Sequence, residues 1–109
     1  MHRGRSRRER MGVSMNIYIS GPIEGVDNYR EKFERAKRIV EKGGNKVINP
    51  AGLDLYGLTR EQILNVDLVL LDLCDTIYML KGWEQSCGAN REYGYALAKG
   101  MGIMFERDE

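Results

Sequence analysis

The feature that most constrains this chain is a regular alternation of short β-type runs and longer amphipathic stretches, which begins at Asn16. Strands that alternate with helices form right-handed βαβ units. We therefore predict an α/β domain whose parallel sheet is covered by helices on both faces. The β-type runs are Asn16–Ser20, Lys46–Asn49, Thr76–Leu80 and Gly102–Phe105. Apolar residues recur at helical spacing over about Val26–Lys42, from Thr59 onward and over Ser86–Lys99.

Local sequence signals mark the ends of these helices. Gly43 and Gly44 follow the first helical stretch and are typical of a helix C-terminus. The second stretch has Thr59 at its expected start and Gln62 three residues later, which is the spacing of a capping box. Ser86 is the expected N-cap of the third helix. The first helix is predicted to bury one face, made of Tyr29, Phe33, Ala36, Ile39 and Val40.

Length and composition restrict the class of protein. A chain of 109 residues makes one domain of ordinary size. It has no apolar run near the ~20 residues that cross a bilayer, and no N-terminal hydrophobic stretch typical of a secretory signal. Cys74 and Cys87 lack the spacing of a zinc site or a disulfide framework. We therefore expect a cytoplasmic protein that does not associate with a membrane.

The single histidine, His2, lies close to the N-terminus and far from the predicted strands. Ser-His and Cys-His nucleophilic pairs need an imidazole, as do most catalytic zinc sites. Asp67, Asp72 and Asp75 offer only hard oxygen ligands, which makes a metal-dependent hydrolase the less favoured interpretation. Catalysis would therefore use carboxylates, tyrosines, lysines or backbone amides, and we expect neither a metal nor a cofactor.

The N-terminal segment differs in charge from the rest of the chain. Residues 1–14 hold five Arg and one Glu, which leaves 12 basic and 15 acidic side chains in residues 15–109. We interpret residues 1–14 as a disordered Arg-rich tail, or as a segment upstream of an alternative start at Met15, and residues 15–109 as the folded domain. A basic arm can bind phosphates of nucleic acid. Because this arm lacks interleaved aromatic residues and precedes an acidic domain, we do not expect nucleic acid as a partner.

Asp67 and Glu92 are acidic residues that stand inside the apolar stripes of their helices. Because burying a carboxylate is costly unless it is paired or hydrogen-bonded, two such residues suggest a polar pocket toward which both helices point. The alternative is that each one caps a backbone group or forms an ion pair with Arg60 or Arg91. The stripe around Asp67 consists of Ile63, Leu64, Leu68 and Leu71. The stripe around Glu92 consists of Ala89, Tyr93, Ala96 and Leu97.

Ligands of open α/β sheets bind outside the carboxyl ends of the strands. The loop before Glu92 lies at such an end. Within it, Ser86 either caps the helix or contacts a ligand, and Gly88 would let a ligand approach Glu92 closely. Trp83 either stacks on a base or packs the loop. The pocket is therefore expected to draw on residues 20–25, 49–52 and 80–88.

Three motifs occur in a recognisable order along the chain. They are Ile17-Tyr18-Ile19-Ser20-Gly21-Pro22, the spaced pair Asp67 and Asp75, and Ser86-x-Gly88-x-x-x-Glu92-Tyr93-Gly94-Tyr95-Ala96-Leu97-Ala98-x-Gly100. With Gly82-Trp83-Glu84, they resemble the nucleoside 2-deoxyribosyltransferase-like superfamily, and most closely its DUF4406 branch, over about residues 16–105. The resemblance implies a Rossmann-like, flavodoxin-like three-layer sandwich with a four- to five-stranded parallel sheet. It also implies an enzyme that splits the N-glycosidic bond of a nucleoside or nucleotide.

The resemblance also implies roles for individual residues. Glu92 matches the family's nucleophile and Asp67 its general acid/base. Ser86 stands where transferases place a carboxylate for the 5′ hydroxyl and nucleotide hydrolases a phosphate-binding serine. Pro22 and Glu24 replace a serine and an arginine of the nucleotide hydrolases, which argues against a phosphate there. The candidate substrate-binding residues are Tyr18, Ser20, Gly21, Pro22, Ile23, Trp83, Ser86 and Gly88.

Two interpretations of function follow. In the first, the protein is an N-glycosidase or 2-deoxyribosyltransferase acting on a (deoxy)nucleoside or its 5′-monophosphate, with an ionised Glu92 and an Asp67 whose pKa is raised by burial. In the second, it is a non-catalytic nucleotide-binding or oligomeric accessory protein of phage type. In both we expect a homo-oligomer, a dimer or larger, because the superfamily usually assembles and so small a domain exposes much apolar helix surface.

Overall fold

The computed structural model describes residues 14–53 and 57–107, and within them four strands form one parallel sheet. The strands are β1 (Asn16–Ser20), β2 (Lys46–Ile48), β3 (Thr76–Met79) and β4 (Gly102–Phe105), in the order β2-β1-β3-β4. In this register Tyr18 of β1 pairs with Ile48 on one side and with Ile77 on the other. The predicted parallel sheet is therefore confirmed, with β1 and β3 as its central strands.

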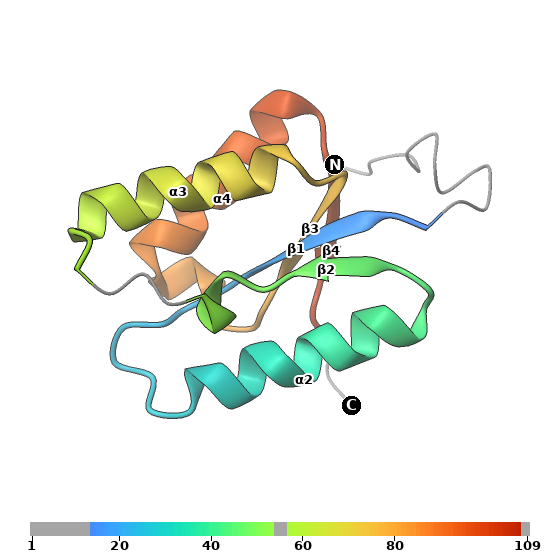
Figure 1. Ribbon diagram of the computed structural model, residues 1–109, viewed down its shortest axis with the longest axis horizontal. Coiled ribbons are helices and arrows are strands. Elements are labelled where there is room, and N and C mark those ends of the chain that lie inside the picture. Colours follow the sequence, from blue (N-terminus) through green and yellow to red (C-terminus); the bar gives the residue numbers. More distant parts are fainter. Residues whose placement is uncertain (1–13, 54–56, 108–109) are drawn as a thin grey trace.

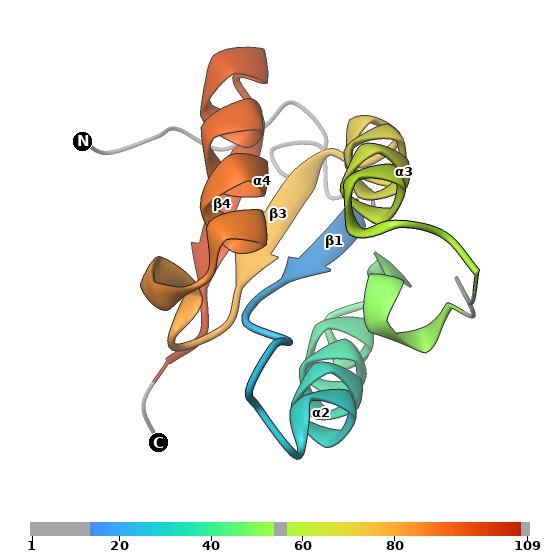
Figure 2. The same cartoon turned by 90° about the vertical axis from the view of Figure 1, so that its left-hand side faces the viewer.

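Helices cover both faces of the sheet, as predicted. Figure 2 shows α3 (Arg60–Asp72) and α4 (Cys87–Lys99) on one side and α2 (Tyr29–Lys42) on the other. The side chains of β1 alternate between these layers. The buried cluster under α2 contains Met15, Ile17, Ile19, Phe33, Ala36, Val40, Tyr78 and Leu80. The cluster under α3 and α4 contains Tyr18, Leu71, Cys74, Ile77, Met79, Ala89, Ala96 and Met101.

The chain order creates a switch point between the two central strands. From β1 the chain passes through α2 to β2 at one edge, and it then returns through α3 to β3 on the other side of β1, as Figure 1 shows. Loops that leave the carboxyl ends of β1 and β3 therefore diverge to opposite faces of the sheet. Such a divergence opens a crevice in which α/β proteins bind ligands.

The predicted helix signals are present as hydrogen bonds. At the start of α3, the Gln62 backbone N–H donates to the Thr59 hydroxyl at 3.1 Å, and the Thr59 N–H donates to the Gln62 side chain at 2.9 Å. The backbone N–H of Ala89 donates to Ser86 Oγ at 3.1 Å, so Ser86 caps α4. These caps fix where the two site-bearing helices begin.

Several predicted boundaries were wrong by a few residues. Helix α2 begins at Tyr29 and not near Val26, because backbone turns occupy the preceding residues. Strand β2 ends at Ile48, since the side chain of Asn49 accepts from Ala51 N–H to cap the short helix η1 (Pro50–Gly52). Strand β3 ends at Met79, one residue before Leu80.

One residue of the predicted core face, Ile39 of α2, is exposed. It is 44% exposed, whereas Phe33, Ala36 and Val40 on the same helix are buried.

The prediction for the Arg-rich segment concerns residues 1–14, of which the structure describes only Ser14. The rest of that segment lies outside the described residues. In residues 14–53 and 57–107, no helix combines the length and the apolar character of a membrane span.

Candidate active site

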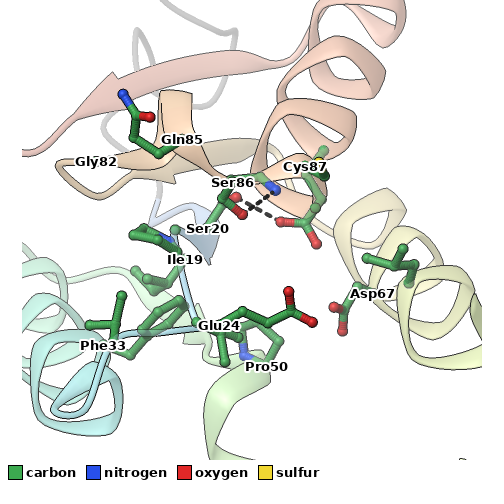
Figure 3. A pocket seen from close by; sticks show the side chains of 18 of the residues that line it. Ile19, Ser20, Glu24, Phe33, Pro50, Asp67, Gly82, Gln85, Ser86 and Cys87 are labelled. Atoms are coloured by element: carbon green, nitrogen blue, oxygen red, sulfur yellow. Dashed lines mark hydrogen bonds between the residues drawn. The ribbon is translucent and has the colours of Figure 1, made fainter. Parts of the chain in front are cut away.

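A cavity of about 680 Å³ lies at the carboxyl ends of β1 and β3. Its walls are the end of β1 with the following loop, the first half of α3, and the loop that leads into α4. Figure 3 shows that the labelled side chains from these segments surround one hollow. The three segments predicted from the strand ends all contribute: residues 20–24, Pro50, and parts of residues 81–88.

Glu92 projects from α4 to the end of β1, and its side chain is almost completely buried, with 6% exposed. Ser20 Oγ donates to Glu92 Oε1 at 2.6 Å, and the Tyr18 hydroxyl donates to Oε2 at 2.9 Å. The predicted alternative of an ion pair with Arg91 is wrong, because Arg91 donates to Asn65 at 3.1 Å on the exposed surface. Each oxygen of the buried carboxylate therefore has one hydroxyl donor.

Asp67 approaches the same cavity from α3 and is 7% exposed. Its carboxyl group points into the hollow in Figure 3. Among the described residues, Oδ1 of Asp67 has no hydrogen-bond donor. The predicted alternative of an ion pair with Arg60 is wrong, because Arg60 pairs with Glu24 instead. A buried carboxyl oxygen without a donor is unfavourable for stability, which is typical of a group kept for function.

Burial raises the pKa of both acidic groups. The pKa of Asp67 rises to about 6, although hydrogen bonding to Glu92 opposes the rise. Burial raises the pKa of Glu92 to about 7, against the effect of the hydrogen bonds from Ser20 and Tyr18. A raised pKa was expected for Asp67, and burial raises the pKa of Glu92, which was expected to be ionised, as well. Burial also raises the pKa of Tyr18, which therefore remains a neutral donor.

Charged residues line the mouth of the cavity. Glu24 of the loop after β1 forms an ion pair with Arg60 at the start of α3, and both side chains are largely exposed. Lys32 and Lys81 also line the cavity. The negative charge of Glu24, which argues against a phosphate from sequence, is thus neutralised by a partner 36 residues away.

Two glycines set how closely the walls approach one another. A Cβ on Gly21 would lie 2.8 Å from the Cβ of Leu80, so glycine is needed where the chain leaves β1 beside the end of β3. A Cβ on Gly88 would lie 3.2 Å from Leu64 Cδ2, which places α3 and α4 in close contact there. Gly88 therefore permits this close packing of the helices, and it lines the same cavity as Glu92.

The predicted substrate-binding residues divide into two groups. Trp83 is not among the residues that line the cavity, and its ring packs on Tyr93 at 4.6 Å and on Phe105 at 6.2 Å between ring centroids. Of the two interpretations of Trp83, these ring contacts support packing of the loop, and Trp83 stands apart from the other predicted substrate-binding residues. The others line the cavity: Tyr18, Ser20, Gly21, Pro22, Ile23, Ser86 and Gly88.

Sequence reasoning did not assign several cavity residues to the site. Lys32 and Phe33 come from the first turns of α2, whose apolar face was interpreted only as core. Ile63 and Leu64 were recognised as an apolar stripe, and this stripe forms the wall next to Asp67. Gln85 and Cys87 flank Ser86 in a segment already expected to contribute.

In the described part of the chain, no group of three His, Cys, Asp or Glu side chains is arranged to hold a metal ion.

The segment of the chain that forms the sheet, the helices and the cavity matches a known protein family. Residues 15–105 match the family model described as "Domain of unknown function (DUF4406)". The chain belongs to this family. The matched range of this DUF4406 protein spans the four strands and three α-helices found in the described residues, together with the residues of the cavity. No curated protein matches it.

Among solved structures, a 2-desoxiribosyltransferase from Leishmania mexicana is similar to this DUF4406 protein, with a TM-score of 0.65 and 24% sequence identity. The similarity covers 83% of this chain and 62% of that chain, so the DUF4406 protein spans less than two thirds of the neighbour's length. At this identity the similarity establishes the fold alone. It confirms the α/β sandwich predicted from the alternation of strands and helices.

Proposed function

We propose that this DUF4406 protein cleaves the N-glycosidic bond of a (deoxy)nucleoside or (deoxy)nucleoside 5′-monophosphate, and passes the sugar to water or to another base. The observation that carries the proposal is the pair of buried carboxyl groups, Glu92 and Asp67, on one cavity. The volume of about 680 Å³ falls in the range of small-molecule sites. The name of the Leishmania mexicana neighbour, a 2-desoxiribosyltransferase with this fold, adds support.

In the first step, ionised Glu92 attacks C1′ of the sugar through an oxocarbenium-like transition state. The C1′–N bond breaks, its electron pair goes to the base, and protonated Asp67 donates a proton to the departing base. A glycosyl ester between Glu92 and C1′ results. In the second step, water or an incoming base attacks C1′, Asp67 removes the proton, and the ester bond breaks to restore the Glu92 carboxylate.

This sequence needs one proton on the two carboxyl groups. With pKa values of about 6 for Asp67 and about 7 for Glu92, the pair holds one proton near neutral pH. For two groups in contact these values belong to the pair, so substrate binding can leave the proton on Asp67 when the base departs. Carboxyl groups whose environments keep one protonated and one ionised are a common basis of glycosidase chemistry.

A binding module without turnover is the second candidate function. It is favoured by the raised pKa values of the pair, because a proton that resides on Glu92 near neutral pH makes this carboxyl group non-nucleophilic. The same cavity would then bind a nucleotide without breaking the glycosidic bond.

One experiment separates the two. The purified protein is incubated with each deoxynucleoside and each 5′-monophosphate, and release of free base is followed by chromatography. We expect release by the natural protein and by Glu61→Gln, which changes an exposed carboxylate of α3 outside the cavity, and none by Glu92→Ala or Glu92→Gln. Turnover by folded Glu92→Ala contradicts the proposal, whereas binding by the natural protein without base release supports the binding module.

We also propose that the protein forms a homo-oligomer. Val69 on α3 and Leu73, the C-cap residue of α3, lie four residues apart and are both 64% exposed, so two large apolar side chains occur close together on the surface. Light scattering after gel filtration measures the mass in solution. A mass of about 12.5 kDa at all concentrations would contradict the expectation.

A further inference from the structure

We propose that Ser20 is a positioning residue for Glu92: its hydroxyl holds one carboxylate oxygen while the Tyr18 hydroxyl holds the other, so that the carboxylate meets the sugar in one orientation. This inference rests on the proposed function, in which Glu92 attacks C1′. It assigns Ser20 to Glu92 and not to the substrate, which differs from the expectation based on sequence.

The geometry comes from the central strand. Tyr18 and Ser20 are two positions apart on β1, so their side chains leave the same face of the sheet, toward α4. Both are fully buried, at 0% and 1% exposure. The backbone of Ser20 is fixed by its pairing with Met79 of β3 and by the bond from the Leu80 N–H to the Ser20 carbonyl at 2.8 Å. The position of Ser20 Oγ is therefore set by the sheet and not by a mobile loop.

Two donors are needed to hold a glutamate carboxylate. The Glu side chain has several rotatable bonds, so that a single hydrogen bond leaves the plane of the carboxylate free to turn. Bonds of 2.6 Å to Oε1 and 2.9 Å to Oε2, both from one rigid strand, fix this plane. A carboxylate oxygen accepts more than one hydrogen bond, so each oxygen keeps a lone pair for the reaction.

The same bonds favour the ionised carboxylate that the reaction needs. Ser20 makes the shorter bond, and it opposes the effect of burial on the Glu92 pKa more than Tyr18 does. The titratable groups that act on Glu92 are Tyr18 of β1, which is neutral, and Asp67 of α3, whose charge raises the pKa of Glu92. The other charged side chains that line the cavity are Glu24, Lys32, Arg60 and Lys81.

The test compares Ser20→Ala with a matched control, Thr76→Val. Thr76 carries a buried hydroxyl on the adjacent strand, and this hydroxyl contacts Met15 Sδ and not Glu92. Titration of ¹³C-labelled Glu92 by NMR gives its pKa without any need for turnover. We expect the pKa of Glu92 to rise by about one unit in Ser20→Ala, because a hydrogen bond to the ionised form is lost, and to stay unchanged in Thr76→Val.

The kinetic readout separates positioning from substrate binding. In Ser20→Ala we expect kcat to fall by about 10- to 100-fold with little change in KM, and the acidic limb of the pH profile to move to higher pH. Thermal unfolding verifies that each variant folds. Should Ser20→Ala not fold, Ser20→Cys, which keeps the size but offers a weak donor, is expected to show the same changes at smaller amplitude.

The outcomes are separable from those of the proposed function. An unchanged Glu92 titration in a folded Ser20 variant overturns the inference, as does a rise in KM with unchanged kcat. A shifted titration in a protein that releases no base supports the contact between Ser20 and Glu92 but rejects the proposed reaction. A shifted titration together with the loss in kcat supports both.

Discussion

Asp67 and Glu92 meet from neighbouring helices with both carboxyl groups buried, and burial raises the pKa of each, to about 6 and about 7. In the unfolded chain both groups titrate near pH ~4. The folded protein therefore binds these protons more tightly than the unfolded chain does. The resulting stabilisation is fully present below about pH 4 and is lost as the pH rises through 6 and 7.

The first prediction concerns this linkage. Glu92→Gln removes a carboxyl group that must ionise in a buried site, so we expect its free energy of unfolding at pH 8 to exceed that of the natural protein by on the order of 1–3 kcal/mol. At pH 4 the two proteins should differ much less. Urea unfolding between pH 4 and pH 8 measures the difference. If the free energies of unfolding of the two proteins changed in parallel with pH, Glu92 would ionise in the folded protein without a cost in stability. Glu61→Gln, which changes an exposed carboxylate, is the control.

The second prediction concerns the proton that the leaving base needs. Without a carboxyl proton at position 67, Asp67→Asn is expected to release ordinary bases about 10²- to 10⁴-fold more slowly than the natural protein. A deoxyriboside with a leaving group that departs without protonation should be cleaved at nearly the natural rate. The ratio of kcat/KM for the two substrate classes is the measurement. An equal loss on both substrates would show that Asp67 does not act as a general acid.

The third prediction concerns Gly94 within α4 and Gly100, which caps its C-terminus. Gly94 lies within the helix, and a Cβ there would meet no atom within 4 Å, so Gly94→Ala is expected to stabilise the protein by about 0.5–1 kcal/mol. Gly100 ends the same helix with a φ of 71°, so Gly100→Ala is expected to destabilise it by about 1 kcal/mol. Thermal unfolding should give shifts of opposite sign. A loss of stability in Gly94→Ala would indicate a contact on that face of α4.

The fourth prediction concerns the close approach of β1 and β3 at the cavity. Gly21→Ala would place a Cβ 2.8 Å from Leu80 Cβ, an atom held by the buried backbone, and should cost about 1–3 kcal/mol of stability. Gly52→Ala is the control, because its Cβ would lie 3.6 Å from the nearest atom, at ordinary contact distance. Chemical denaturation compares the two. Equal stability of both variants would mean that the strand ends separate readily.

The parts of the site that depend on local pattern could be predicted from sequence. Asp67 and Glu92 interrupt apolar stripes of period 3.6. This periodicity alone predicts that both residues lie on the buried faces of their helices, and both are buried in the structure. The capping box of Thr59 and Gln62 is a local signal of the same kind. These features need only the residues of one helix.

The contacts between elements could not be predicted in the same way. The bond from Ser20 to Glu92 joins residues 72 apart, and the pair of Glu24 with Arg60 joins residues 36 apart. Both depend on which strand ends meet at the switch point. Ile39 has the spacing of a buried residue on α2 but is exposed, whereas Ala36 and Val40 on the same helix are buried. Periodicity gives the phase of a helix, and only packing determines how wide its buried face is.

The two hydroxyl groups that hold Glu92 come from β1, one of the two central strands, whereas other parts of the cavity wall come from the segments that follow β1 and precede α4. In the proposed reaction, chemistry at the sugar would therefore depend on the strand and recognition of the base on the loops. We expect substitutions in the loops to alter which base is accepted without moving Glu92. Related chains would then diverge in substrate preference while the proposed reaction is inherited through the strand.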